Sequence, residues 1–315
     1  MEILWPYRDG EVGEFFYARY GHPVVAETEA ALGVLDGGTA LLFPSGTGAA
    51  TALVLSLLRP GDTIALAAGA YYGTGRLFET LAPWGVGYVE FDQTGQPPEG
   101  AQLVWLEAPS NPLLTMPDLE AAVAYPAPVV VDSTVATPIG FRPLEHGADY
   151  ALHSATKYLG GHDDVLLGVV VCREEGAADA LRTLRGRTGI SPAAEPAWLL
   201  HRSLRTLEVR VRRQEASAAA IAERLREHPK VDTVRYPGLG GLISFDVADA
   251  HAARRVETST RLVVNATSLG SVTSLIEGRH RWEGDRVPAG LLRLSVGLED
   301  PDAIWVDLAQ ALDRA

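Results

Sequence analysis

Short apolar segments alternate with amphipathic segments through the first two thirds of the chain. Most apolar segments are continuous rather than alternating, which is typical of strands covered by helices on both faces of a largely parallel sheet. The segments between them have helical spacing and helix-ending signals, such as Pro60-Gly61 after residues 48–59. The pattern therefore predicts an α/β architecture, with strands at residues 63–68, 86–91, 103–107, 128–132, 149–154 and 166–172 and a further helix at 117–124.

The pattern changes near residue 195. Residues 195–228 carry apolar positions at helical spacing, which predicts one or two long amphipathic helices. Strands are expected after them, followed by a closing helix at residues 301–315. We therefore expect a short N-terminal arm (residues 1–20), a large domain (21–205) and a smaller α+β C-terminal domain (206–315), with strands at 231–236, 241–247 and 291–297.

The net charge of −13 excludes some classes of partner. Non-specific binding of nucleic acid or of an anionic membrane needs clustered positive charge, so neither partner is expected. The one cysteine, Cys172, cannot form an intrachain disulfide, and the acidic amino terminus has no signal-peptide pattern. These features predict a cytoplasmic protein that acts on a small molecule.

Only two lysines occur in the chain, Lys157 and Lys230. Lys157 directly follows a predicted strand and is flanked by the hydroxyls of Ser154 and Thr156 and by glycines. This setting suits an amine held near an anionic group, and lysine forms Schiff bases readily when burial or a neighbouring cation lowers its pKa. Taken alone, the same features also fit a surface lysine on a loop.

Two further segments suggest a cofactor site. Asp132 ends a buried strand, at the edge where α/β sheets bind ligands, although a helix-capping aspartate also fits this position. The segment Ser45–Gly48 opens a predicted helix, whose first N–H groups can bind phosphate. It is neither a nucleotide P-loop nor a GxGxxG motif, and by itself it fits a plain turn better.

Ten motifs occur together in the order found in one enzyme family. They are YARYGHPV, SGTGAA, YYGTGRLF, EAPSNP, VVVDSTVATP, SATKYLGGHDDV, LRTL, VRYPGL, GLISF and LLRLSVGLED. From about residue 17 onward the chain resembles the Cys/Met-metabolism enzymes that depend on pyridoxal 5′-phosphate (PLP), the cystathionine γ-synthase/γ-lyase family. The resemblance implies PLP as cofactor and the type I fold of PLP-dependent transferases (aspartate aminotransferase-like), with a mostly parallel sheet flanked by helices.

The resemblance also implies roles for individual residues. Lys157 matches the lysine that carries PLP and moves protons at the substrate's Cα and Cβ. Asp132 matches the partner of the pyridine nitrogen, and Tyr72 the tyrosine stacked on the cofactor ring. Asn111 matches the residue bound to the PLP 3′-oxygen, which also lies near the substrate, with Glu107 supporting that region. The phosphate is expected to be held by Gly46, Thr47, Ser154 and Thr156.

Substrate and subunit contacts are implied in the same way. Arg293 matches the arginine that clamps the substrate α-carboxylate, with Ser268 beside it. Tyr17 and Arg19 match residues that reach the phosphate of a neighbouring subunit, which implies a homodimer or homotetramer with shared active sites. No metal site is expected.

Several segments depart from the family pattern. Thr267 replaces a glutamate that often precedes the SLG motif, residues 279–290 lack the usual substrate-side segment, and the loop after Tyr72 is one residue short. The predicted reaction is elimination or replacement at the γ (or β) carbon of sulfur amino acids or O-acylhomoserine, of the cystathionine γ-lyase/γ-synthase type. Methionine γ-lyase, O-acetylhomoserine sulfhydrylase and aminotransferase chemistry stay open, as does a non-catalytic PLP-binding homologue.

Overall fold

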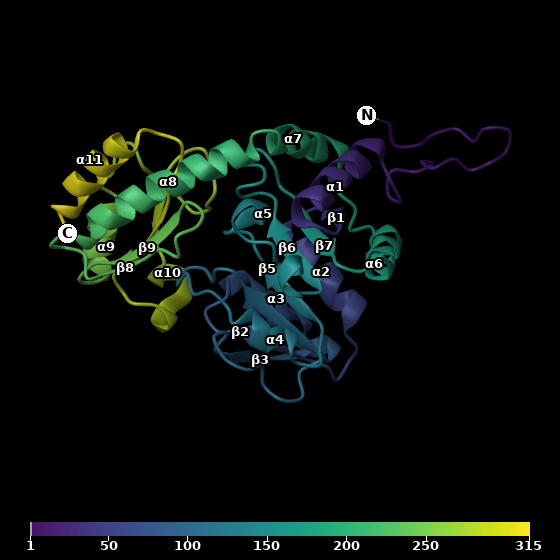
Figure 1. Cartoon of the computed structure of the whole chain (residues 1–315), viewed down its shortest axis with the longest axis horizontal. Coiled ribbons are helices and arrows are strands. Elements are labelled where there is room, and N and C mark those ends of the chain that lie inside the picture. The colour runs from purple at the N-terminus through teal and green to yellow at the C-terminus, as the bar shows by residue number, and fades with distance from the viewer. Residues whose placement is uncertain (1) are drawn as a thin grey trace.

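The computed structural model describes residues 2–315 of the chain. Two sheets with their covering helices make up the body, and helix α8 (Leu207–Arg226) extends from one to the other (Figure 1). The segment before α1 (Pro23–Asp36) reaches away from this body as an extended hairpin-like arm (Figure 1). The position of the domain boundary at residues 205–206 stays a prediction.

The larger sheet has seven strands in the order β1-β7-β6-β5-β4-β2-β3. Neighbouring strands among β2 to β6 pair in parallel, whereas β7 is antiparallel to both β1 and β6. Strand β1 therefore runs in the same direction as β6. The strands are β1 (Thr39–Phe43), β2 (Thr63–Ala67), β3 (Gly87–Phe91), β4 (Leu103–Glu107), β5 (Val129–Asp132), β6 (Tyr150–Ser154) and β7 (Gly168–Cys172).

The six strands predicted for this sheet are all present, within two residues of the expected ends. Strand β1 was not predicted, because it is a short run whose partner in the sheet lies more than a hundred residues away. Helices connect the strands and flank the sheet, and four of them, α1, α3, α5 and α6, were also not predicted. The other elements are α2 (Gly46–Leu57), α3 (Tyr72–Leu81), α4 (Leu119–Val123), α5 (Thr137–Gly140), α6 (Glu175–Thr188), α7 (Ala194–Leu204), and the 3₁₀ turns Ala82–Trp84 and Pro143–His146.

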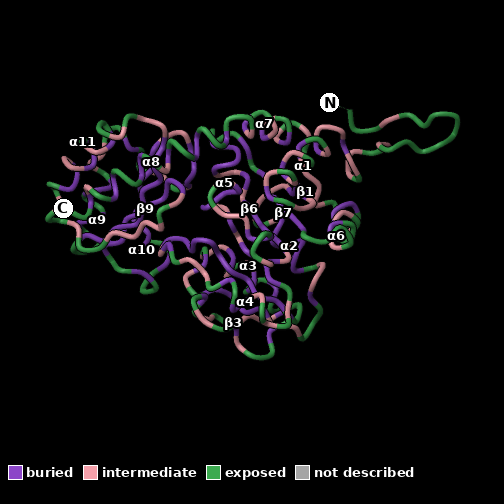
Figure 2. Tube along the Cα trace, viewed as in Figure 1, coloured by how far each residue is buried: buried purple, intermediate pink, exposed green. Residues whose placement is uncertain are grey.

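Strands β4 and β7 are buried along their whole length, and β5 and β6 are buried except at their last residue (Figure 2), which confirms that both faces of the sheet are covered. One apolar cluster joins the sheet to α2 and α3, and includes Leu53, Phe78 and Trp105. A second lies on the other face, where Leu32 of α1 and Leu200 of α7 pack. The edge that carries the functional side chains is therefore held rigidly between two layers of helices.

The smaller sheet has five strands in the order β10-β11-β12-β9-β8. Its third apolar cluster, which includes Ile221, Phe245 and Ile304, joins it to α8, α9 and α11. The predicted strands and closing helix are confirmed here, whereas β10, β11 and α9 were not predicted. The elements are β8 (Thr233–Arg235), β9 (Leu242–Asp246), α9 (Ala250–Glu257), β10 (Val264–Asn265), β11 (Leu275–Gly278), α10 (His280–Glu283), the 3₁₀ turn Gly284–Arg286, β12 (Leu291–Ser295) and α11 (Pro301–Leu312).

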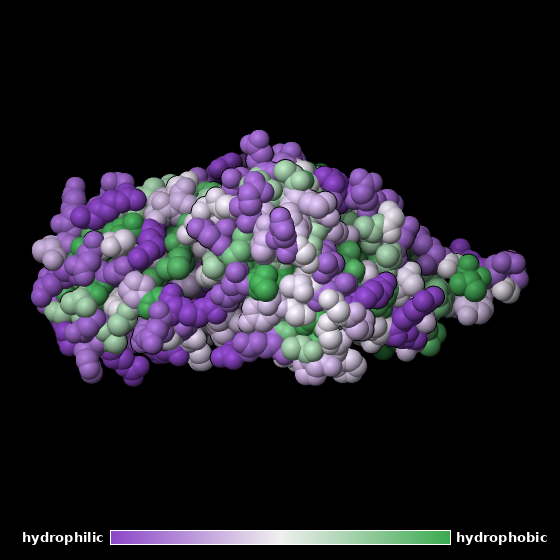
Figure 3. All heavy atoms as spheres, turned by 90° about the horizontal axis from the view of Figure 1, so that it is seen from below, coloured by the Kyte–Doolittle hydropathy of each residue, from purple (hydrophilic) through white to green (hydrophobic). Residues whose placement is uncertain are grey.

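The surface is mixed rather than dominated by one apolar face (Figure 3). Apolar side chains are exposed on the arm at the right of this view, including Ile3, Leu4, Tyr7 and Val12. Among residues 2–315, no helix combines the length and the apolar character that crossing a membrane requires.

One glycine lets a functional loop approach the sheet closely. A Cβ atom at Gly168, the first residue of β7, would lie 2.1 Å from the carbonyl oxygen of Ser45 and 2.8 Å from the Cα of Gly46. No side chain fits at that distance, so the start of α2 can lie against β7 only because position 168 is glycine.

We predict that Gly168→Ala lowers the free energy of unfolding by about 2–3 kcal/mol, since the backbone of the Ser45 loop must shift to accept the methyl group. Gly176 is the matched control, because a Cβ there would meet nothing within 4 Å. Gly176→Ala should leave stability unchanged or raise it by up to about 1 kcal/mol, as expected for a helical glycine. Urea unfolding followed by circular dichroism measures both, and equal stability of the two variants would contradict the packing argument.

Candidate active site

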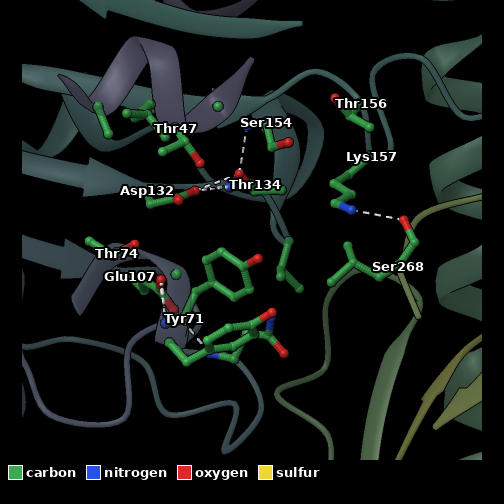
Figure 4. Close-up of a pocket in the computed structure, with 18 of the residues that line it drawn as sticks. Thr47, Tyr71, Thr74, Glu107, Asp132, Thr134, Ser154, Thr156, Lys157 and Ser268 are labelled. Atoms are coloured by element: carbon green, nitrogen blue, oxygen red, sulfur yellow. Dashed lines mark hydrogen bonds between the residues drawn. The ribbon is translucent and has the colours of Figure 1, made fainter. Parts of the chain in front are cut away.

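One pocket collects the carboxyl ends of five strands of the larger sheet. Because β1, β2, β4, β5 and β6 run in the same direction, the residues that follow them meet at one edge, where α/β proteins bind ligands. The C-terminal part of the chain closes the other side. The lining includes Ser45, Gly46, Thr47, Tyr71, Tyr72, Glu107, Asn111, Asp132, Thr134, Ser154, Thr156, Lys157, Thr267, Ser268, Arg279 and Arg293 (Figure 4).

Lys157 reaches into this pocket from the turn after β6. Its backbone N–H donates to the carbonyl of Ser154, and its Nζ donates to Oγ of Ser268 at 2.8 Å (Figure 4). Burial, and then the positive charge of Arg293, lowers the pKa of Lys157 to about 8. A substantial fraction of this amine is therefore uncharged, and nucleophilic, near neutral pH.

Asp132 and Glu107 end adjacent strands and are paired in register. Asp132 accepts hydrogen bonds from the backbone N–H and the hydroxyl of Thr134, and Glu107 accepts from the N–H groups of Tyr71 and Asn111 (Figure 4). Burial raises the pKa of both carboxyls, and the Asp132 charge raises that of Glu107 further. Two buried carboxylates side by side favour a cation between or beside them.

The start of α2 forms a concave backbone surface beside β6. Ser45 caps the helix by accepting from the N–H of Gly48, which leaves the N–H groups of Gly46 and Thr47 without a partner within the helix. A Cβ at Gly46 would lie 3.0 Å from Cβ and 3.2 Å from Oγ of Ser154, so glycine keeps this space open. Backbone N–H groups at a helix start, with the hydroxyls of Ser154 and Thr156 nearby, suit a phosphate group.

Arg293 enters the pocket from β12 and is 3% exposed. Its Nη1 donates to Oδ1 of Asn111, and its Nη2 donates to the carbonyl of Ser268. Ser268 itself has a φ of 94°, a conformation rarely adopted by residues other than glycine, and strain of this kind is concentrated at functional sites. The guanidinium therefore lies in a fixed position within reach of the Lys157 side of the pocket.

Two consecutive tyrosines line the pocket in different ways. The backbone N–H of Tyr71 is bound to Glu107, and burial, then the neighbouring Tyr72, raises the pKa of its phenol to about 12. The ring of Tyr72 instead stacks against Trp282 of the smaller domain, with centroids 6.1 Å apart and planes 9° apart. Tyr72 is thus engaged in an interdomain contact.

Tyr17 and Arg19 do not line this pocket. The guanidinium of Arg19 lies over the ring of Tyr20, 4.4 Å from its centroid, and donates to the carbonyl of Gly186. Both residues belong to the arm that precedes α1. The other predicted site residues are all brought together in the pocket.

Four residues that the sequence did not single out also belong to this site. Thr134 holds Asp132, Tyr71 is bound to Glu107, and Glu277 and Arg279 lie behind Arg293. A signal for Tyr71 was present, because taking it as the tyrosine of the motif removes the one-residue shortening of the following loop. Arg279 falls in the segment 279–290, which lacks the family pattern, and Glu277 lies just before it in none of the quoted motifs.

The arrangement matches the three functional parts of PLP. The Lys157 amine can take an aldehyde carbon, the buried Asp132 can pair with a protonated pyridine nitrogen, and the start of α2 can bind a phosphate. Among residues 2–315, no group of three or more His, Cys, Asp or Glu side chains could hold a metal ion.

Known proteins support the same assignment. The family model described as "Cys/Met metabolism PLP-dependent enzyme" matches residues 6–313. The chain is 38% identical to a cystathionine gamma-synthase of Mycobacterium tuberculosis, over 95% of this chain and 87% of that protein. It is 43% identical to an L-methionine gamma-lyase of Streptomyces avermitilis, over 94% of this chain and 75% of that protein.

A solved structure extends the likeness to the fold. The cystathionine gamma synthase of Xanthomonas oryzae pv. oryzae, in complex with aminoacrylate and cysteine, superposes with a TM-score of 0.94 at 33% identity, and the match covers 99% of this chain and 91% of that one. The predicted type I fold, the PLP cofactor and the enzymatic nature of the chain are thereby confirmed, and none of these relatives supports a non-catalytic homologue. The chain belongs to the Cys/Met metabolism PLP-dependent enzyme family.

Proposed function

We propose that this enzyme eliminates or replaces the γ (or β) substituent of a sulfur amino acid or an O-acylhomoserine, in the manner of a cystathionine γ-lyase or γ-synthase. The observation that carries the proposal is the position of Lys157. Its amine, with a pKa lowered to about 8, shares one pocket with the buried Asp132 and the Arg293 fork. Proton removal at Cα of an amino acid requires a base, a carboxylate that keeps the pyridine nitrogen of PLP protonated, and a group that binds the substrate carboxylate.

Bound PLP supplies an electron sink for negative charge that develops at the substrate's Cα. Lys157 carries protons between Cα, Cβ and the leaving group, and its hydrogen bond to Ser268 fixes the position of the amine in the pocket. Asp132 keeps the pyridine nitrogen protonated, while Thr134 holds the carboxylate in place. Glu107 fixes the backbones of Tyr71 and Asn111, two residues that line the pocket and would contact the cofactor there.

Tyr71, rather than Tyr72, is the better candidate to stack on that ring. Its backbone N–H donates to Glu107, which lines the pocket, whereas the ring of Tyr72 is already stacked on Trp282. This proposal replaces the expectation from sequence, in which Tyr72 held that role.

The phosphate group would bind at Gly46, Thr47, Ser154 and Thr156. In this proposal Tyr17 and Arg19 of a second copy of the chain complete the phosphate site, because the arm that carries them extends from the body with its apolar residues exposed (Figure 3). The working assembly would then be a homodimer or homotetramer. The acidic composition and the single cysteine favour a cytoplasmic enzyme.

The substrate's leaving group is the open part of the proposal. Thr267 lines the pocket where a glutamate often stands in the family, which removes a carboxylate partner for the distal ammonium of cystathionine. The named relatives include both a synthase and a methionine lyase. Methionine γ-lyase and O-acetylhomoserine sulfhydrylase activity are therefore tested beside cystathionine chemistry.

The test combines absorbance with product analysis. L-Cystathionine, L-methionine and O-acetyl-L-homoserine are added in turn to the PLP-loaded enzyme, and the visible cofactor band and the 2-oxo acid are followed. A band shift with 2-oxo acid release identifies a lyase and its substrate, and product formation only with an added thiol identifies a synthase or sulfhydrylase. A band that responds to none of them would contradict the proposal.

We predict that PLP incorporation into the cofactor-free protein accelerates with pH. The lowered pKa of Lys157 means that its amine is protonated below about pH 8 and uncharged above it. The rate should therefore rise roughly tenfold per pH unit below pH 8 and level off above it. Stopped-flow absorbance measures this rate, and a rise that continues unchanged to pH 10 would show that the amine has the pKa of an ordinary lysine.

We also predict that the two tyrosines differ in their contribution to cofactor binding. Tyr71→Ala should raise the Kd for PLP about tenfold, because a stacked aromatic ring is worth about 1 kcal/mol beyond its buried area. Tyr72→Ala should change this Kd less than threefold. Fluorescence titration of the cofactor-free variants measures both, and the reverse order would return the stacking role to Tyr72.

A further inference from the structure

Four buried side chains of alternating charge form a chain behind the pocket. Nη2 of Arg293 lies 3.1 Å from Oε2 of Glu277, which also accepts from Nη1 of Arg279 at 2.8 Å. Nη2 of Arg279 in turn donates to Oε1 of Glu283 at 2.8 Å. All four side chains are 5% exposed or less, so their charges are screened weakly and act strongly on one another.

The segment that carries three of these residues also contacts the larger domain. Trp282 donates its indole N–H to Oε1 of Glu277 at 2.6 Å and stacks on Tyr72. The guanidinium of Arg279 lies 5.8 Å from the centre of the same Tyr72 ring, and Arg279 lines the active-site pocket. The two oxygens of Glu277 are thus held between Arg293, Arg279 and Trp282.

Arg293 keeps a defined part of its hydrogen-bonding capacity free. A guanidinium has five N–H donors, and three contacts are made, to Asn111, to the Ser268 carbonyl and to Glu277. The two donors that remain are the Nε–H and one Nη1–H; because both Nη2 hydrogens are used, a carboxylate can be bound by two parallel hydrogen bonds only if it takes over a donor now held by Glu277 or the Ser268 carbonyl. The three protein contacts fix the orientation of the guanidinium, and Glu277 occupies a donor that a bidentate substrate carboxylate would use.

Glu277 nevertheless competes with any substrate carboxylate for the charge on Arg293. Burial alone would raise the pKa of Glu277, but the charges of Arg279 and Arg293 outweigh it and lower the pKa, so this carboxyl is ionised. The four side chains sum to zero formal charge. Without Arg279 the sum is −1 before the substrate arrives, and Glu277 would pair with Arg293 alone.

We propose that Glu277 and Arg279 are positioning residues for the substrate. Glu277 orients the guanidinium of Arg293. Arg279 pairs with Glu277 and offsets its negative charge, so that Arg293 can still bind an α-carboxylate. The inference rests on the proposed function of Arg293 as the carboxylate clamp. It assigns a role to Glu277 and to the start of the segment 279–290, in which this chain departs from the family pattern. Substrate affinity should accordingly depend on the pair as a unit.

A double-mutant cycle on the PLP-loaded enzyme tests this dependence. The probe is L-norleucine, an unreactive amino acid, and its Kd is measured by the change in cofactor absorbance and by calorimetry. Arg279→Met should raise this Kd by about tenfold or more, because Glu277 then neutralises Arg293. In the Glu277→Gln background the same Arg279→Met change should alter the Kd by less than about threefold, because the competing charge is gone.

Pentylamine separates the clamp from general packing, because it is norleucine without the carboxylate. Its Kd should change less than about threefold in every variant, since it makes no contact that depends on charge at Arg293. Arg279→Lys keeps the charge and should restore most of the norleucine affinity lost in Arg279→Met. If Arg279→Met does not fold, the Kd values of Arg279→Lys and Glu277→Gln for norleucine and for pentylamine still test the inference.

Arg286→Met is the matched control for the same segment. Arg286 is half exposed and pairs with Glu90 rather than with the chain behind the pocket, so its norleucine Kd should equal that of the wild type. The inference would be overturned if the two substitutions raised the norleucine Kd additively, or if they raised the Kd for pentylamine as much as that for norleucine. Either result would leave the proposed function intact. A wild-type enzyme that binds pentylamine as tightly as norleucine would contradict both.

Discussion

The site depends on two buried carboxylates at the ends of adjacent parallel strands. Glu107 and Asp132 are paired in register, and their hydrogen bonds come from backbone N–H groups and the Thr134 hydroxyl rather than from a charged donor. Burying two such groups side by side raises the pKa of both, which makes the ionised pair unfavourable in the protein alone. In the proposed function a protonated pyridine nitrogen beside Asp132 would relieve this cost, so cofactor binding and carboxylate placement would support each other.

The rest of the fold supplies what this pair needs. Parallel strands bring Asp132, Glu107 and the Lys157 turn to one edge of the sheet. Because β7 is antiparallel to both β1 and β6, β1 ends at the same edge, and the start of α2 follows it there. Gly168 allows that helix start to lie against the sheet. The smaller domain then places Arg293 opposite Lys157, and its charge contributes to the lowered pKa of the amine. One cation thus lowers the pKa of the lysine and, in the proposed function, also binds the substrate carboxylate.

The sequence predicted the elements that are long, continuous and locally encoded. Strands such as residues 103–107 carry their own apolar signal, and the motif around Lys157 predicted a functional lysine that the structure places in the pocket. Strand β1 was missed because its place depends on pairing with distant β7. Tyr71 and Tyr72 are chemically identical neighbours, and the one-residue shortening of the loop was the one sequence signal that could separate them. In the structure, the hydrogen bond from the Tyr71 backbone to Glu107 and the stacking of Tyr72 on Trp282 distinguish them. The Glu277–Arg279 pair was not predicted, because its role depends on the contact of Glu277 with Arg293, which lies in another strand.

The central claim is that Lys157 is the residue that binds PLP, and the chain offers an internal control because its only other lysine is Lys230. Lys230 is exposed and reaches the carbonyl oxygen of Ala315, far along the chain from the pocket. The PLP-loaded protein is reduced with borohydride, digested and mapped by mass spectrometry. The account predicts a pyridoxyl group on Lys157 at about one per chain and none on Lys230. Equal labelling of the two lysines, or labelling of Lys230 alone, would contradict it.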